Sequence, residues 1–109
     1  MSIMNMIDRE FLEYIVPNGG YKPYTQQVLR FENGYGASII SDGYGSESGL
    51  LELAVILWIK TGPNEEYKFN ICYDTPLTEN VLGFLTCEEV NQYLKMIKNL
   101  PEKENENAG

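Results

Sequence analysis

The stretch "QQVLRFENGYGASII", residues 26–40, decides the fold, because an Asn33-Gly34 step lies between two alternating segments. A two-residue turn would pair Phe31 with Gly36 and mix polar with apolar partners. A three-residue loop over 32–34 instead places the apolar residues of both segments on one face: Leu29, Phe31, Tyr35, Ala37 and Ile39. A slip of one residue moves every side chain to the opposite face, so we favour the three-residue loop. It puts Gly34 at the left-handed position of a bulge, where a missing Cβ avoids a clash. The stretch predicts a β-hairpin rather than a phosphate-binding glycine loop.

Three further segments extend this hairpin. Residues 41–49, "SDGYGSESG", form a turn-rich loop that is longer than a hairpin needs, and such loops are often functional. Residues 50–59 are almost continuously apolar, which predicts a central strand covered on both faces. Residues 67–74, "YKFNICYD", alternate, so we expect another strand with one side facing the core. Residues 75–85 are interpreted as a connection with apolar anchors.

Helical patterns occur at both ends of the chain. Thr86 precedes Glu89 by three residues, which is a capping box at the start of a helix. The apolar stripe of this helix consists of Val90, Tyr93, Leu94 and Ile97. Residues 4–16 favour a short N-terminal helix, and an extended segment over 12–16 is the alternative.

The sequence therefore predicts an α+β domain over residues 1–100, followed by a polar tail over 101–109. Its architecture is a small antiparallel β-meander of about four strands, with the C-terminal helix packed on one face. We expect the N-terminal segment to cover the other face. If it does not, the face that carries Ile56 and Trp58 should contact a second subunit, and a homodimer is favoured.

The composition excludes several classes of function. The chain of 109 residues has a net charge of −8, and eight Lys and Arg residues make no basic footprint for direct nucleic-acid binding. Histidine is absent, so the usual general base is missing and we predict that the protein is not an enzyme. Cys72 and Cys87 are too few for a zinc site, and no metal or cofactor is expected. We expect two buried thiols, and a disulfide or a reactive thiol is the alternative. No apolar run is long enough to cross a bilayer, so we expect a soluble cytoplasmic protein.

Candidate binding residues come from the tyrosines and from the polar loop. Tyr44 lies between two glycines of the loop 41–49, where an aromatic side chain suits partner contacts or base stacking, and packing within the loop is the alternative. Trp58 has the parity of Ala54 and Ile56, on a second apolar face. The predicted binding residues are Tyr35, Asp42, Tyr44, Ser46, Glu47 and Trp58. Four carboxylates would form a metal cluster only if the fold gathers them, and we favour scattered surface acids: Asp42, Glu47, Glu52 and Asp74.

Three segments, "FENGYGASII", "GLLELAVI" and "YDTPLTENVLGFLTCEEVNQYLKMI", resemble a class of small tailed-phage accessory proteins. The motifs of the resemblance are N-G-Y-G-x-S, G-L-x-E-L-A-V, Y-D-T-P and E-E-V, over about residues 28–98. The resemblance implies a phage protein in the host cytoplasm, and it transfers no catalytic residue. Small acidic accessory proteins of phages are often inhibitors of host machinery or defence, so the resemblance implies such a role by association with the family and not from the fold.

Three functions are consistent with these observations. The first is a non-enzymatic protein that binds and inhibits a host protein, for example one of the host's defence proteins. An acidic inhibitor of this kind could bind a basic groove of a nucleic-acid enzyme. The second is a homo-oligomeric sponge for a nucleotide signal, in which Tyr35 or Tyr44 stacks on a base, with Arg30 and Lys68 as the only sheet cations placed to help. The third is a structural accessory of the virion.

Overall fold

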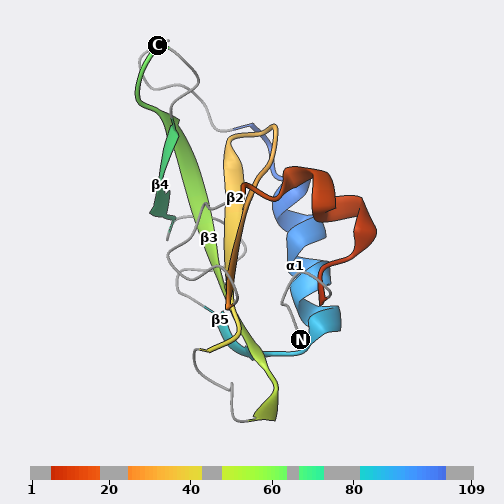
Figure 1. Ribbon diagram of the computed structural model, residues 1–109. Helices are drawn as coiled ribbons and strands as arrows, with labels where there is room; N and C mark the ends of the chain where they lie inside the picture. Colours follow the sequence, from red (N-terminus) through yellow and green to blue (C-terminus); the bar gives the residue numbers. More distant parts are fainter. Residues whose placement is uncertain (1–5, 18–24, 43–47, 64–66, 73–81, 103–109) are drawn as a thin grey trace.

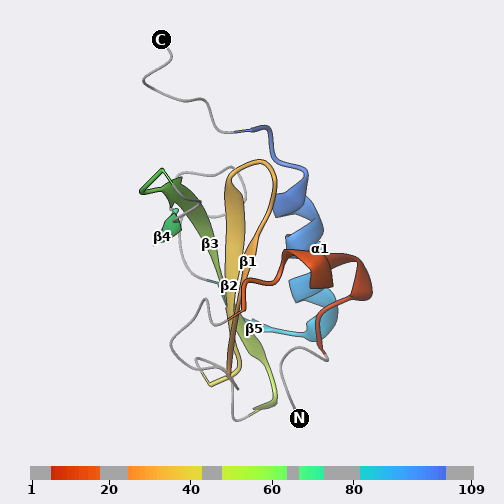
Figure 2. The ribbon, with the colours of Figure 1, turned by 45° about the horizontal axis from the view of Figure 1, so that its top comes forward.

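The computed structural model describes residues 6–17, 25–42, 48–63, 67–72 and 82–102. Its elements are the 3-10 helix η2 (Arg9–Tyr14), the strands β1 (Gln26–Arg30), β2 (Tyr35–Ile40), β3 (Leu51–Lys60), β4 (Tyr67–Ile71) and β5 (Leu82–Leu85), and the helix α1 (Cys87–Lys98). The sheet is antiparallel with the order β1-β2-β3-β4, and β5 pairs with β3. Figures 1 and 2 show η2 and α1 on the same side of the sheet. The predicted α+β class, with an antiparallel meander and a C-terminal helix, is confirmed.

The first hairpin has the predicted register. Leu29 pairs with Ala37, and Gln27 pairs with Ile39. The Phe31 N–H donates to the Tyr35 carbonyl oxygen at 2.8 Å, which closes the three-residue loop. Gly34 has a φ of +90°, the left-handed conformation that the bulge requires. Side-chain alternation and one Asn-Gly step were therefore sufficient to define this register.

Strand β3 is the centre of the sheet, as its apolar run predicts. One edge pairs with β2 over Glu52–Leu57. The other edge is divided, because β4 pairs with its Ile56–Lys60 half and β5 pairs near Leu51 and Leu53. Most of β3 is consequently buried, from Leu51 to Ile56 apart from Glu52.

Strand β5 lies in the segment that the sequence assigned to a connection, and this part of the interpretation was wrong. Leu51 pairs with Leu85 and Leu53 pairs with Leu82, so β5 has an extra residue between the two pairs. Phe84 lies at this irregularity with a φ of 58°, and its side chain is 64% exposed. A four-residue strand with a bulge has no regular alternation, so its pattern does not indicate a strand.

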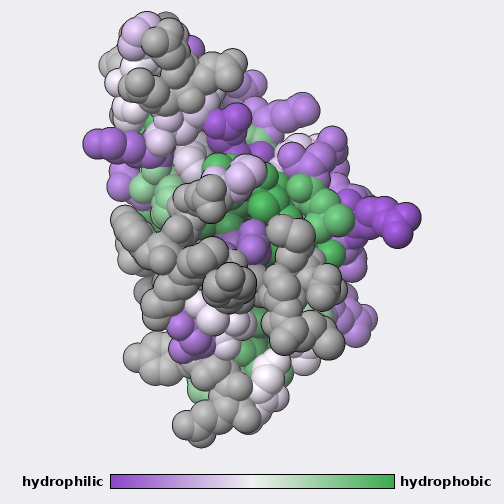
Figure 3. All heavy atoms as spheres, in the orientation of Figure 1, coloured by the Kyte–Doolittle hydropathy of each residue, from purple (hydrophilic) through white to green (hydrophobic). Residues whose placement is uncertain are grey.

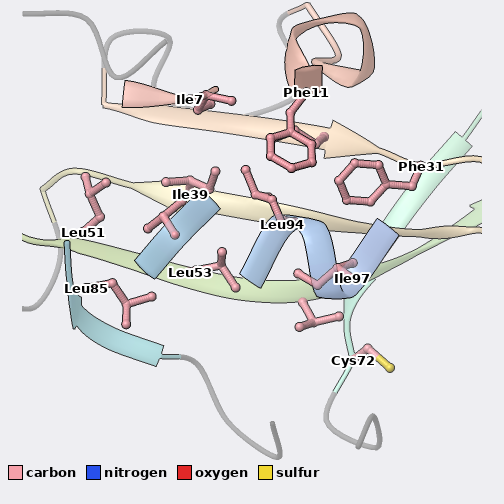
Figure 4. Close-up of a cluster of buried hydrophobic side chains, with 14 residues drawn as sticks. Ile7, Phe11, Phe31, Ile39, Leu51, Leu53, Cys72, Leu85, Leu94 and Ile97 are labelled. Atoms are coloured by element: carbon pink, nitrogen blue, oxygen red, sulfur yellow. The ribbon is translucent and has the colours of Figure 1, made fainter. Parts of the chain in front are cut away.

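The hydrophobic core lies between the sheet and the layer of η2 and α1. Figure 4 shows Ile7 and Phe11 from the N-terminal segment beside Leu94 and Ile97 of α1, facing the sheet. The Phe11 and Phe31 rings meet edge to face at 6.3 Å between centroids. The N-terminal segment therefore covers the same face as α1, and the expectation that it covers the opposite face was wrong.

The N-terminal segment combines the two alternatives that the sequence left open. Residues 9–14 form the 3-10 helix, and the chain is extended from Ile15. Ile15 makes a bridge with Leu29, and the Val16 N–H donates to the Val28 carbonyl oxygen at 2.8 Å. These contacts cover part of the outer edge of β1.

Helix α1 begins with the predicted capping box. The Thr86 Oγ1 accepts from the Glu89 N–H at 3.1 Å, and a Glu89 carboxylate oxygen accepts from the Thr86 N–H at 3.0 Å. The helix buries Val90, Leu94 and Ile97 completely, and Tyr93 packs against the core, as the stripe predicts.

The two cysteines have different environments. Cys72 is part of the core, but Cys87 is the first residue of α1 and is exposed. The prediction of two buried thiols was therefore wrong for Cys87. Cys87 has the helical spacing of the apolar stripe, but it lies at the first position of α1 and lines the open groove at that end of the helix, which explains its exposure.

Two asparagine side chains join segments that are far apart in the chain. Asn91 donates through Nδ2 to the Met6 and Cys87 carbonyl oxygens at 3.0 and 2.8 Å, and its Oδ1 accepts from the Asp8 N–H at 2.8 Å. Asn33, in the first hairpin loop, donates to carbonyl oxygens at the C-terminus of α1. The turn signal of Asn33 is thus also a helix cap.

Candidate functional site: an aromatic cluster on the sheet

Three aromatic residues and one arginine gather on the face of the sheet opposite α1. They are Arg30 of β1, Trp58 of β3, and Tyr67 and Phe69 of β4, here named the aromatic cluster. Trp58 pairs directly with Phe69 across the two strands, so both side chains lie on one face. Their ring centroids are 5.1 Å apart, and Tyr67 meets Trp58 edge to face at 6.5 Å.

Arg30 completes the cluster by stacking. Its Cζ atom lies 4.1 Å from the centroid of the Tyr67 ring and 6.0 Å from that of Trp58. The electron-rich face of an aromatic ring attracts a guanidinium, by about 0.5–1 kcal/mol at exposed sites. The stack joins β1 to β4, two strands that are not neighbours in the sheet.

The Trp58 indole is held in one orientation by the backbone. Its Nε1 donates to the Leu29 carbonyl oxygen at 2.9 Å, across the intervening strand β2. Gly36 makes this possible, because a Cβ at that position would collide with the Leu29 carbonyl oxygen and lie 2.6 Å from Trp58 Nε1. A glycine is thus required where the indole crosses β2.

The cluster is partly open to solvent at β4. Arg30 is exposed, Tyr67 is 36% exposed, and Trp58 and Phe69 are half-buried. Ile71, two residues further along the same face, is 43% exposed. Rigid aromatic rings beside an exposed guanidinium offer contact area and one positive charge, which suits binding rather than proton transfer or nucleophilic attack.

The middle of this face is buried within the chain. Val28, Ala54 and Ile56 are buried although they lie outside the main core cluster, and Ile56 is 0% exposed. Ile56 is therefore covered within the chain, whereas Trp58 on the same face stays half-buried, and the expected homodimer stays a prediction.

The predicted binding residues do not form one site. Trp58 belongs to the aromatic cluster, whereas Tyr35 lies on the opposite face and packs against the core. Asp42 is exposed beyond the other end of β2. Tyr44, Ser46 and Glu47 lie outside the described residues.

Three members of the cluster are absent from the predicted binding residues: Arg30, which was considered only as a cation near a nucleotide, Tyr67 and Phe69. The signal was present in part, because the hairpin register pairs Arg30 with Gly36 and thereby places it on the face opposite Leu29. The pairing of β3 with β4 would have added Phe69 beside Trp58. No local pattern indicates that Arg30 reaches over to Tyr67.

Ion binding finds little support in the described part of the chain. Within it, no group of three or more Cys, Asp or Glu side chains is placed to hold a metal ion. Of the four carboxylates considered above, Glu47 and Asp74 lie outside the described residues. Arg30 pairs with Gly36 and Gly36 pairs with Ile56, so Arg30 lies on the face of Trp58. Lys68 pairs with Ile59, the residue next to Trp58, so Lys68 lies on the opposite face. The two cations therefore do not converge on one phosphate within a single subunit.

A shallow groove of about 720 Å³ lies on the other side of the molecule, between the N-terminal segment and α1. Its lining residues are Met6, Asp8, Glu10, Cys87, Glu88, Asn91, Gln92 and Lys95. The groove is acidic, with three carboxylates and one ammonium group. Asn91 is fully hydrogen-bonded to the backbone, so it is not free to bind a ligand there.

No helix in the described part of the chain is long and apolar enough to span a membrane. No protein-family model, curated protein or solved structure matches the chain.

Proposed function

We propose that the chain is a non-enzymatic protein that binds and inhibits a host protein, and that the aromatic cluster is its contact surface. The observation that supports this proposal is a rigid group of Trp, Tyr and Arg side chains that remains partly exposed. These residue types supply most of the energetically dominant residues at protein interfaces. The resemblance to phage accessory proteins suggests the setting, an infected cell.

The rigidity of the cluster favours tight binding. Ordering a flexible side chain at an interface costs about 0.5–1.5 kcal/mol, and this cost falls when the side chain is already fixed. The hydrogen bond from Trp58 to Leu29 and the stacking of Arg30 on Tyr67 fix three side chains before any partner arrives. The cluster is therefore preorganised as a contact surface.

The charge of the chain favours a protein over a nucleic acid. Aromatic rings and arginine also bind single-stranded bases, but such sites lie in positively charged grooves that follow the phosphates. The chain has a net charge of −8, and Arg30 is the only cation within the cluster. Repulsion of phosphates would outweigh a single stacking contact.

Affinity capture from infected host lysate, followed by mass spectrometry, tests the proposal. Three baits are compared: the unchanged chain, Arg30→Ala, and the matched control Glu13→Ala, which also removes an exposed charged side chain but on η2. We expect the first and third baits to retain a host protein. Loss of an interfacial arginine of this kind weakens binding by about 1–2 kcal/mol, which is about 5- to 30-fold.

Two results would contradict the proposal. Recovery of no host protein above background would reject the function. Equal recovery by all three baits, with loss of the partner on Glu10→Lys and Glu88→Lys, would assign the contact to the acidic groove and reject the aromatic cluster. Calorimetry with cyclic nucleotides and proteomics of purified virions separately test the sponge and the virion accessory.

A further inference from the structure

Strand β4 lies at an edge of the sheet, and its residues are open to solvent. Four of its five residues are exposed, and Phe69 is half-buried. Figure 3 shows hydrophobic surface over β4, at the left of the view, and Figure 1 shows β4 on the side of β3 away from β2. The opposite edge of the sheet differs, because Ile15 and Val16 pair there with β1.

The hydrogen-bonding groups of the β4 edge can be assigned from one bond. The Cys72 N–H donates to the Val55 carbonyl oxygen at 2.8 Å, so the backbone groups of Cys72 point toward β3. Backbone groups alternate in direction along a strand. Those of Lys68 and Asn70 therefore also point toward β3, and those of Tyr67, Phe69 and Ile71 point to the outer edge. No hydrogen bond between described residues engages this outer edge.

We propose that two copies of the chain pair through β4, antiparallel, about a two-fold axis at Phe69. In this register Phe69 faces the partner's Phe69, and Tyr67 faces the partner's Ile71. All of these residues direct their N–H and C=O groups outward, so each pair exchanges both backbone hydrogen bonds. The hydrogen-bonding groups of β4 are then satisfied by the same groups of the partner's β4, which is the condition for an isologous interface.

Charge selects this register over its neighbour. Lys68 faces the partner's Asn70, and β4 contains no carboxylate. A shift that pairs Tyr67 with the partner's Phe69 would place the two copies of Lys68 directly opposite each other, which is unfavourable. Two chains of net charge −8 repel one another, so an edge without carboxylates is where they can meet at least cost.

The pairing uses the edge of β4 and leaves its faces open. Tyr67 and the partner's Ile71 lie on the face of the aromatic cluster, so the two clusters form one continuous apolar surface across the axis. The dimer itself does not depend on the proposed host partner.

Charge substitutions at Asn70 test the pairing. Asn70 is exposed and lies on the face opposite the aromatic cluster. Asn70→Lys places the new ammonium group opposite the partner's Lys68, and Asn70→Glu places a carboxylate there instead. Each change acts twice in a two-fold dimer, so we expect the dissociation constant to rise about 2- to 30-fold for Asn70→Lys and to fall by a similar factor for Asn70→Glu.

Sedimentation velocity over low to high micromolar concentrations measures these constants, and far-ultraviolet circular dichroism checks that each variant is folded. The double variant Lys68→Glu with Asn70→Lys creates an opposite-charge pair in the reverse order and should dimerise like Asn70→Glu. Added salt should strengthen the unchanged dimer, because it screens the repulsion of two acidic chains. A monomer at high micromolar concentration, or equal dissociation constants for Asn70→Lys and Asn70→Glu, would overturn the proposal. Capture of a host protein by monomeric Asn70→Lys would still support the proposed function.

Discussion

Replacing Asn33 with Asp should uncouple the first hairpin from the C-terminus of α1. The Asn33 Nδ2 lies 2.8 Å from the Ile97 carbonyl oxygen, 3.0 Å from that of Leu100 and 3.2 Å from that of Lys98, and its Oδ1 accepts from the Tyr35 N–H at 3.0 Å. An aspartate keeps the shape and the acceptor, but it loses both N–H donors. It also places a negative charge at the negative end of the helix dipole.

The magnitude follows from these contacts. A hydrogen bond contributes about 1 kcal/mol net, and the two amide hydrogens serve three carbonyls, so Asn33→Ala should cost about 1–3 kcal/mol. The charge at the helix end adds about 0.3–1 kcal/mol, so Asn33→Asp should cost about 2–4 kcal/mol at neutral pH. Such a loss is a large part of the about 5–15 kcal/mol that stabilises a domain.

The difference between the two variants should depend on pH. The carbonyl oxygens disfavour the ionised form of the new carboxyl group in the folded state, so its folded pKa lies above the unfolded value of about 3.9. The excess cost of Asn33→Asp over Asn33→Ala is therefore present at neutral pH and disappears as the pH falls through these two values. Urea unfolding followed by Trp58 fluorescence measures both free energies of unfolding. If both variants unfold within about 0.5 kcal/mol of the unchanged chain, the cap does not contribute to stability.

Three further predictions use the same unfolding assay or a chemical label. Asn91→Leu leaves partly buried backbone groups of the N-terminal segment without their side-chain partner and should cost about 1–3 kcal/mol, and a change below about 0.5 kcal/mol would contradict that role. Gly36→Ala should displace the indole that crosses β2, lower the free energy of unfolding by at least about 1–3 kcal/mol and shift the tryptophan emission, whereas unchanged emission would be inconsistent with the crossing. A thiol reagent should label Cys87 in the folded protein and Cys72 only after unfolding, and equal labelling rates would disprove the difference in burial.

Elements that depend on local pattern could be predicted from the sequence. The register of the first hairpin followed from alternation around Gly34, and the start of α1 followed from Thr86 and Glu89. Both features are determined by residues close together in the chain, and each has a defined chemical signal. The central position of β3 could also be predicted from the sequence, because a strand with one face toward solvent would alternate apolar with polar residues, whereas β3 is almost continuously apolar.

Features that depend on contacts between distant segments could not be predicted. Asn91 binds the backbone of Met6 and Asp8, although it looks like an ordinary polar residue in the sequence. Asn33 binds the end of α1, although its sequence context indicates only a turn. The N-terminal segment has an apolar side that would suit either face of the sheet. Only the packing of Phe11 against Phe31 reveals which face it covers.

The candidate site shows the same limit. Trp58 could be selected from its parity, but its partners come from β1 and β4. Tyr67 alternates with polar residues, and this alternation predicted a strand with one side facing the core but no binding role for Tyr67. The stacking of Arg30 over Tyr67 spans the sheet, and no spacing along the chain encodes it.

The central claim is that a partner binds at the aromatic cluster, and Trp58 can report on this directly because the chain has one tryptophan. Incorporation of 5-fluorotryptophan gives a single fluorine NMR resonance at Trp58. We expect this resonance to shift or broaden when unlabelled host lysate containing the captured partner is added, and to respond less in Arg30→Ala. A resonance that stays unchanged while the chain is demonstrably bound to its partner would contradict the account, since the contact surface would then lie elsewhere.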